Sequence, residues 1–270
     1  NDTLDVSAGF IKDIFGNAAS SDGRADGAIS YSDTTAPTID TSKGFTSTKN
    51  GNFGLGAKID LTANMSEDVI KGSSFTVTLG TTDQIVLSAA ATGKTLTGEY
   101  TIGSNDNSAD LSISSFVAGT VTDVYGNNMT STSIPSGKNL SDNNAIVIDT
   151  TAPTSTITSA AYNPGTGIIT VTGTNLQTMN VSSPSSTDHK SYLDWSKFVW
   201  DIDGNDGSGN KTFSVSDITK VVAPNASTLT ITLTSDAKTA LNGTTGFGAI
   251  GGNDTLDVSA GFIKDIFGNA

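Results

Sequence analysis

Residues 57–63 read Ala-Lys-Ile-Asp-Leu-Thr-Ala, and their apolar and polar side chains alternate without a break. Side chains of a β-strand point to its two faces in turn, so this pattern predicts a strand with one buried face. The stretches Ser74–Leu79 and Thr228–Leu233 alternate in the same way and are rich in Thr, Val and Ile, which favour strands. The chain is therefore expected to contain many half-buried strands.

Turn signals between the strands indicate that neighbouring strands run antiparallel. A hairpin is predicted at 156–171 around an Asn-Pro-Gly-Thr-Gly turn, and a second one at 198–215 around a Gly- and Asn-rich turn. No window carries a convincing helical stripe, and the best candidate, 235–241, allows one or two turns. Several short strands with regular turns predict an all-β chain of antiparallel β-sandwich domains.

An 18-residue sequence occurs twice at an offset of 252 residues, because residues 1–18 and residues 253–270 both read NDTLDVSAGFIKDIFGNA. Chance does not explain eighteen identical positions, so we expect one full period of a tandem array and the start of the next. Two shorter motifs recur inside the period. Asp-Thr-Thr-Ala-Pro-Thr begins at 33 and 149, and Asp-x-aromatic-Gly-Asn begins at 13, 123 and 265.

These motifs divide the chain into three parts. Residues 1–32 are expected to be the C-terminal strands of a preceding repeat. Residues 33–148, called the first unit below, are expected to form one sandwich, and residues 149–270, the second unit, another. The second unit is expected to carry an insert at 182–210 and to lack its last strand. Units of this length can each bury a core, which favours an array of whole domains over a solenoid.

The composition excludes several classes of function. Lys and Arg number 14 against 27 Asp and Glu, a formal net charge of −13, so the basic footprint that nucleic acids and anionic lipids require is missing. The absence of Cys and the single His, His189, exclude disulfides, thiol nucleophiles and Cys/His metal sites. No apolar run approaches the ~20 residues that cross a bilayer. We expect no nucleic acid partner and no membrane insertion in this segment.

Several short motifs in the first unit occur in a characteristic order. They are Met65-Ser66-Glu67-Asp68-Val69, Gly93-Lys94-Thr95-Leu96-Thr97-Gly98-Glu99-Tyr100-Thr101-Ile102, Asp110-Leu111, the Asp-x-Tyr-Gly-Asn turn and the Asp-Thr-Thr-Ala-Pro-Thr junction. Over nearly all of 33–154 this order resembles the bacterial Ig-like tandem repeats of giant surface adhesins and biofilm-associated proteins, and S-layer-like proteins carry similar repeats. The resemblance implies tandem Ig-like β-sandwiches in a long, secreted protein of the bacterial cell surface.

Acidic residues are expected to converge at one end of each unit. In a seven-stranded sandwich, the entering linker, the loop after the second strand and the loop before the last strand lie at the same end. Converging carboxylates repel one another unless a cation is present, and a site with only oxygen ligands favours Ca²⁺. The alternative is that these residues cap turns and that proline stiffens the linker. The ligand set expected at the first unit is Asp33, Glu67, Asp123 and Asn127, with Asp68 as a further candidate.

Two further calcium sites are considered. The equivalent site at the second unit would use Asp149, Asp265 and Asn269, with Asp106 or Asp110 contributed by the far end of the first unit. The loop from Asp201 to Gly207 superficially resembles an EF-hand loop and would offer Asp201 and Asp203. Asp206 stands where that loop needs glycine, and the glutamate at its twelfth position is missing. A hairpin turn and an isolated calcium site both remain open here.

Four aromatic residues gather within nine positions, namely Tyr192, Trp195, Phe198 and Trp200. Phe198, Trp200 and Ile202 share one parity along a strand, which is typical of a core face, whereas a platform for sugars is the alternative. His189 lies in a Ser- and Thr-rich loop and is expected to be solvated.

Motifs of catalysis are missing from the sequence, so we expect no enzyme. The leading hypothesis is a structural repeat segment of an adhesin stalk, surface fibre or lattice, whose joints calcium stiffens. Its partners would be neighbouring copies of the repeat, joined head to tail and open to β-strand addition by residues 19–33. The alternative is a glycan- or protein-binding adhesion module, which would bind a surface glycan or a ligand on a host or neighbouring cell through the aromatic-rich insert.

Overall fold

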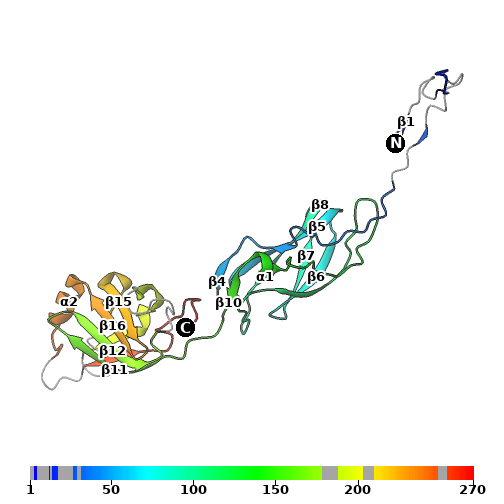
Figure 1. Ribbon diagram of the computed structural model, residues 1–270. Coiled ribbons are helices and arrows are strands. Elements are labelled where there is room, and N and C mark those ends of the chain that lie inside the picture. Colours follow the sequence, from blue (N-terminus) through cyan, green and yellow to red (C-terminus); the bar gives the residue numbers. More distant parts are fainter. Residues whose placement is uncertain are drawn as a thin grey trace.

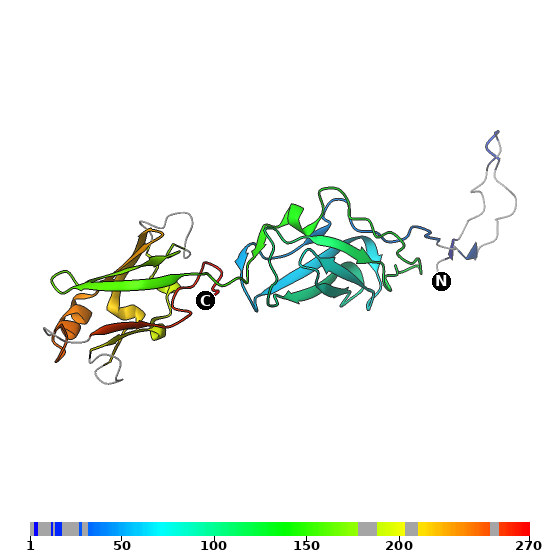
Figure 2. The same ribbon diagram turned by 90° about the horizontal axis from the view of Figure 1, so that it is seen from below.

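The structure is a computed structural model and describes residues 3–4, 12, 14–17, 27–28, 32–177, 188–202, 210–248 and 254–270. Within these residues the chain is all-β, and every ladder is antiparallel except one. Figures 1 and 2 show two bodies placed end to end, with the C-terminus at the end of the second body that faces the first. Neither described helix is long and apolar enough to cross a membrane.

The first body is built around a six-stranded sheet. Its order is β3 (Phe45–Thr46), β5 (Lys58–Val69), β8 (Gly93–Thr101), β7 (Gln84–Ser88), β6 (Ser74–Leu79) and β9 (Ile113–Val117). The parallel exception is the pair of β4 (Gly51–Phe53) with β10 (Ile146–Ile148). A single helical turn, α1 (Leu140–Asn143), precedes β10 and begins with a capping box between Asn139 and Asp142.

The alternating pattern that predicts half-buried strands is confirmed in this body. Ile59, Leu61 and Ala63 on β5 are at most 2% exposed, while Asp60 and Thr62 between them are half-buried. Burial alternates in the same way along β6. The buried residues of this body form one hydrophobic core that draws only on positions 39 to 148.

The second body contains two sheets. One has the order β11 (Thr156–Asn163), β12 (Ile168–Thr174), β16 (Thr228–Leu233) and β15 (Ile218–Asn225). The other has the order β14 (Lys211–Thr212), β13 (Phe198–Asp201) and β17 (Thr255–Val258). The helix α2 (Ser235–Asn242) and the 3₁₀ turns η1 (Lys190–Tyr192), η2 (Trp195–Lys197) and η3 (Val215–Asp217) complete it.

Both predicted hairpins are confirmed, since β11 pairs with β12 and β13 pairs with β14. The buried residues of both sheets form a second core that draws only on positions 169 to 263. The predicted short helix after β16 is confirmed as α2. The turn residues 203–209 lie outside the described residues.

One expectation for the second body is wrong, and the insert expected at 182–210 stays a prediction. Within that stretch β13 pairs with β17, while residues 182–187 and 203–209 lie outside the described residues. His189 is not solvated but fully buried, and its backbone N donates to the Val221 carbonyl at 2.9 Å. The interpretation of the aromatic residues as core is confirmed, with Phe198 at 0%, Trp195 at 7% and Trp200 at 9% exposure.

A small ladder stands at the N-terminal end of the chain. β1 (Thr3–Leu4) pairs antiparallel with β2 (Gly27–Ala28), and the paired positions are Thr3 with Ala28 and Leu4 with Gly27. Because residues 1–18 repeat at 253–270, the sequence of β1 recurs within β17.

Candidate metal centre and turn–linker clamps

Asp123 organises the turn that precedes the last strand of the first unit. Its Oδ1 accepts hydrogen bonds from the backbone N of Tyr125 at 2.9 Å and of Asn127 at 2.8 Å. Gly126 has φ +96°, a conformation that glycine adopts readily and other residues rarely. The motif Asp-x-x-Gly-Asn therefore folds into a tight turn around one carboxylate, which is only 1% exposed.

Asn127 fastens this turn to the linker that enters the unit. Its Nδ2 donates to Oδ2 of Asp123 at 2.8 Å and to the backbone carbonyl of Asp33 at 3.0 Å. The carboxylate of Asp33 in turn accepts from the backbone N of Thr35 at 2.8 Å. We call this arrangement of aspartate turn, asparagine side chain and linker carbonyl the turn–linker clamp.

The end of β5 brings a third carboxylate to the clamp. The backbone N of Ser66 donates to the Thr38 carbonyl at 2.9 Å, and the backbone N of Thr38 donates to Oγ of Ser66 at 3.0 Å. These bonds hold the linker beside Glu67, the next residue of β5. Carboxylate oxygens of Asp33, Glu67 and Asp123 all lie within 4.8 Å of one another, so the predicted convergence of these three residues is confirmed as geometry.

Burial, neighbouring charges and hydrogen bonds shift the pKa values of two carboxylates in this cluster. Burial raises the pKa of Glu67, and the charges of Asp33 and Asp123 raise it further, while Lys94 opposes them. The pKa of Asp123 is pushed up by burial, but the hydrogen bonds donated by Asn127 and by backbone N–H groups outweigh burial and lower it. Lys94 Nζ donates to the Ser66 carbonyl at 3.1 Å. The cluster thus lowers the pKa of Asp123 and raises the pKa of Glu67.

The second unit repeats the clamp contact by contact. Asp265 Oδ1 accepts from the backbone N of Phe267 at 2.8 Å and of Asn269 at 2.9 Å. Asn269 Nδ2 donates to Oδ2 of Asp265 at 2.9 Å and to the carbonyl of Asp149 at 2.9 Å. Asp149 Oδ1 accepts from the backbone N of Thr151 at 2.8 Å. The predicted set Asp149, Asp265 and Asn269 is therefore brought together.

The other predicted ligands of the second site do not join it. Among the described residues, the only group of three converging carboxylates is the one at the first unit. Asp106 is engaged within the first unit, where Oδ2 accepts from Tyr100 Oη at 2.7 Å and from the backbone N of Gly103 at 2.6 Å. Asp110 is exposed and accepts from the backbone N of Ile146 at 3.4 Å. In the second unit the residue that follows β12 is Asn175, which has no carboxylate. Its Nδ2 donates to the Thr154 carbonyl at 3.1 Å.

The far end of the first unit nevertheless contacts the second linker, through residues that sequence reasoning missed. Asn107 Oδ1 accepts from the backbone N of Thr150 at 2.8 Å, and the Phe53 carbonyl accepts from the backbone N of Asp149 at 3.2 Å. A Cβ on Gly54 would lie 2.3 Å from the carbonyl oxygen of Phe267, so only glycine fits there. The linker is thus bonded to the first unit as well as to its own clamp.

The third predicted site is only partly described. Asp201 is 2% exposed and lies on β13 opposite Thr255 of β17. Asp203 lies outside the described residues. The calcium-loop interpretation of 201–207 stays a prediction.

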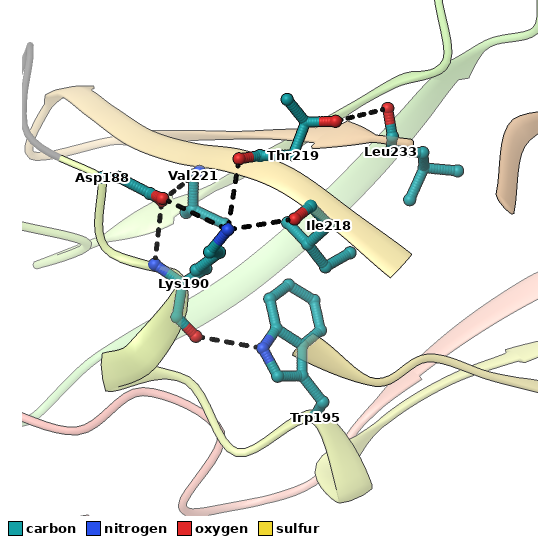
Figure 3. A network of polar contacts seen from close by, with 7 residues as sticks. All are labelled: Asp188, Lys190, Trp195, Ile218, Thr219, Val221 and Leu233. Atoms are coloured by element: carbon teal, nitrogen blue, oxygen red, sulfur yellow. Dashed lines mark hydrogen bonds and ion pairs between the residues drawn. The ribbon is translucent and has the colours of Figure 1, made fainter. Parts of the chain in front are cut away.

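A polar network holds the aromatic-rich segment against β15 (Figure 3). Lys190 Nζ donates to the carbonyls of Ile218 at 3.3 Å and Thr219 at 3.4 Å, and lies 3.6 Å from Oδ2 of Asp188. Asp188 Oδ1 accepts from the backbone N of Val221 at 2.9 Å, and Trp195 Nε1 donates to the Lys190 carbonyl at 3.0 Å. These contacts give the segment a role in packing.

No protein-family model matches the chain, and no curated protein matches its sequence.

Proposed function

We propose that the chain is a structural repeat segment of a long secreted protein of the bacterial cell surface, acting as an adhesin stalk, a surface fibre or a lattice. In this proposal its two bodies are tandem Ig-like β-sandwiches joined head to tail. The observation that carries the proposal is the double attachment of the second linker. Asn269 bonds the linker to the second unit, while Asn107 and Phe53 bond it to the first.

Double attachment of a short linker makes a stiff joint. A linker bonded on one side only would let two domains rotate freely, which is the default for domains with small interfaces. Here Asp149 is bonded to both bodies, through Asn269 and the Phe53 carbonyl, and Thr150 is bonded to the first body. Such a joint transmits orientation from one domain to the next, which a stalk or fibre requires.

Exposed apolar residues at the first clamp favour a further neighbour. Val124 and Tyr125 are 47% and 52% exposed, whereas their counterparts at the second clamp, Ile266 and Phe267, lie next to the first unit and are only partly exposed. In the N-terminal copy of the motif, Ile14 is 93% and Phe15 83% exposed. In an array, the end of a preceding unit would cover these positions.

Calcium at the first clamp is part of the proposal. Asp33, Glu67 and Asp123 offer oxygen ligands within 4.8 Å of one another. Burial and, after it, the charges of Asp33 and Asp123 raise the pKa of Glu67, and a cation would offset both effects. Asn127 contributes by positioning, because its Nδ2 faces both Asp123 and the linker. Among the residues that the structure describes, no third carboxylate converges on the second clamp, so we expect it to bind calcium more weakly.

Stiffness of the joint is tested by distances between the two units. The chain has no cysteine, so Val86→Cys and Val215→Cys, both at exposed positions, allow two specific labels. We expect a narrow distance distribution by single-molecule fluorescence, and a broad one after Asn107→Ala and Asn269→Ala together. Asn128→Ala, an exposed position of the first turn, is the matched control and should change nothing. A broad distribution in the unsubstituted chain would reject the stiff joint.

The calcium proposal predicts that Glu67→Gln changes the melting temperature of the first unit in opposite directions with and without Ca²⁺. A raised folded pKa means that metal-free stability falls as pH rises through the window above the ordinary glutamate value of 4.5. At pH 7 without metal, Glu67→Gln should therefore raise the melting temperature of the first unit. With Ca²⁺ the unsubstituted protein should gain stability, and the variant should gain much less.

Glu99→Gln is the matched control for this experiment. Glu99 is exposed and pairs with Lys58 at 2.5 Å, so the substitution makes the same change of charge away from the cluster and should leave the calcium response intact. If the unsubstituted protein shows no calcium-dependent shift in calorimetry, the metal proposal is wrong, while the joint proposal stands on its own test.

A further inference from the structure

We propose that Tyr100 is the positioning residue of the joint: through Asp106 it fixes the place from which Asn107 bonds the second linker. This inference rests on the proposed function and names the side chain on which the stiffness of the joint depends. Tyr100 lies on β8 and is only 1% exposed, so it acts through the loop that follows its strand.

The hydroxyl of Tyr100 is the centre of a part-buried polar cluster. Its Oη donates to Oδ2 of Asp106 at 2.7 Å and lies 3.4 Å from Oγ1 of Thr81 and from Oδ2 of Asp83. Thr81 Oγ1 in turn donates to Oδ2 of Asp83 at 2.8 Å. These four side chains, which we call the tyrosine cluster, join the turn after β6 to the loop after β8.

Tyr100 is suited to be a lasting donor to Asp106. Burial raises the pKa of Tyr100, and the hydrogen bond and charge of Asp106 and the charge of Asp83 raise it further, while Thr81 opposes them. The hydroxyl therefore keeps its proton at neutral pH. A hydrogen bond to a charged group is stronger than one between neutral groups, so its loss should be felt by the loop that carries Asp106.

Asp106 gives this loop a defined course. Its Oδ2 also accepts from the backbone N of Gly103 at 2.6 Å, and a Cβ on Gly103 would lie only 3.1 Å from the same oxygen. Asn105 has φ +73°, a left-handed conformation that is uncommon outside glycine. Asn107 Nδ2 donates to the Asn105 carbonyl at 3.4 Å. The carboxylate of Asp106 thus fixes the loop from the residues that precede it up to Asn107.

The residue directly after Asp106 makes the contact with the linker. Asn107 Oδ1 accepts from the backbone N of Thr150 at 2.8 Å. On the other side of Asn107, Ser108 exchanges two backbone bonds with Ile148, each at 2.8 Å. Because Asp106 and Asn107 are consecutive, a displacement of Asp106 shifts the side chain of Asn107, whereas Ser108 stays paired. Loss of the Tyr100 hydroxyl should therefore weaken the bond to Thr150 and leave the pairing with Ile148 intact.

Tyr100→Phe in the full chain tests the proposal, because it removes the hydroxyl and keeps the ring. The backbone N–H of Thr150 should exchange its hydrogen faster, by up to about tenfold, since its acceptor Asn107 is less firmly held. The backbone N–H of Thr151, which donates to Asp149 within the linker, should keep its rate. With labels at positions 86 and 215, the distance distribution should broaden as well.

Leu96→Ala is the matched control for loss of stability. Leu96 is fully buried on the same strand and takes no part in the tyrosine cluster. Its substitution should lower the melting temperature of the first unit, yet leave the distance distribution narrow and the exchange rate at Thr150 unchanged. A second pair of variants tests the same path, since Asp106→Ala should act like Tyr100→Phe, whereas Asp106→Asn keeps an acceptor and should act more weakly.

The proposal is overturned if Tyr100→Phe leaves the exchange rate at Thr150 unchanged, or if Leu96→Ala raises this rate equally. It is also overturned if Asn107→Ala broadens the distance distribution and Tyr100→Phe does not. Failure of the stiff joint itself looks different, because the distribution is then broad in the unsubstituted chain. Hydrogen exchange at Thr150 still reports in that case whether Tyr100 positions Asn107.

Discussion

Replacing Phe198 by alanine is expected to lower the free energy of unfolding of the second unit by about 3–5 kcal/mol. Phe198 is fully buried, and its ring stacks on Phe262 at a centroid distance of 4.9 Å and meets Trp195 and Phe213 edge-on, each at 5.8 Å. Because domain stabilities are only about 5–15 kcal/mol, this is a large part of the total. Calorimetry should show one transition shifted to lower temperature and the other unchanged.

Phe45→Ala is the reciprocal substitution in the first core. Phe45 is 1% exposed and meets Phe75 and Phe116 at 6.3 and 5.8 Å, so a similar loss is expected, but in the transition of the first unit. The two cores share no residue, which is why each substitution should act on one transition. If either substitution lowers both transitions together, the units do not fold independently.

Asp123→Ala is expected to lower the melting temperature of the first unit by roughly 10 °C at neutral pH. The substitution leaves the backbone N of Tyr125 and the backbone and side-chain N of Asn127 without their acceptor. Because the folded state lowers the pKa of Asp123, its contribution is present above the ordinary aspartate value of 3.8 and is lost as pH falls through the folded pKa. The difference from the unsubstituted protein should therefore shrink in acid.

Asp68→Ala is the control, because Asp68 is exposed on β5 beside Glu67 and takes no part in the clamp. It should change the melting temperature little. Asp265→Ala should reproduce the effect of Asp123→Ala in the transition of the second unit, since the two turns make the same hydrogen bonds. If Asp68→Ala and Asp123→Ala change the melting temperature equally, the negative charge of the region, and not the hydrogen bonds of the turn, determines the stability of the first unit.

The strands and the first carboxylate cluster could be predicted because they depend on local periodicity and on the order of loops. Alternation in β5 and β6 fixes which side chains are buried, whatever the neighbouring strands are. The position of Asp33, Glu67 and Asp123 at one end follows from the alternation of loops between two ends of antiparallel strands. The recurrence of Asp-x-x-Gly-Asn was also a usable signal for the second clamp.

Features that depend on distant contacts could not be predicted in this way. His189 is buried because its backbone is bonded to Val221 of β15 and the 3₁₀ turn η1 follows it directly. The polar sequence around His189 does not reveal these distant contacts. Asp106 was expected at the second linker, but Tyr100 lies within hydrogen-bonding distance and holds it. Its neighbour Asn107 makes the contact to the linker instead. The parallel pairing of β4 with β10 also joins positions almost a hundred residues apart, for which no short motif exists.

At Gly54 the first unit lies so close to Phe267 of the second that only the hydrogen atom of a glycine fits between them. A methyl group there would lie 2.3 Å from the Phe267 carbonyl oxygen. Alanine, valine and leucine at this position should therefore push the two domains apart by increasing amounts. In a periodic assembly the same joint recurs in every repeat, and a bend of a few degrees at each recurrence accumulates along the chain. In the proposed array, this one glycine would thus influence the curvature of the whole assembly.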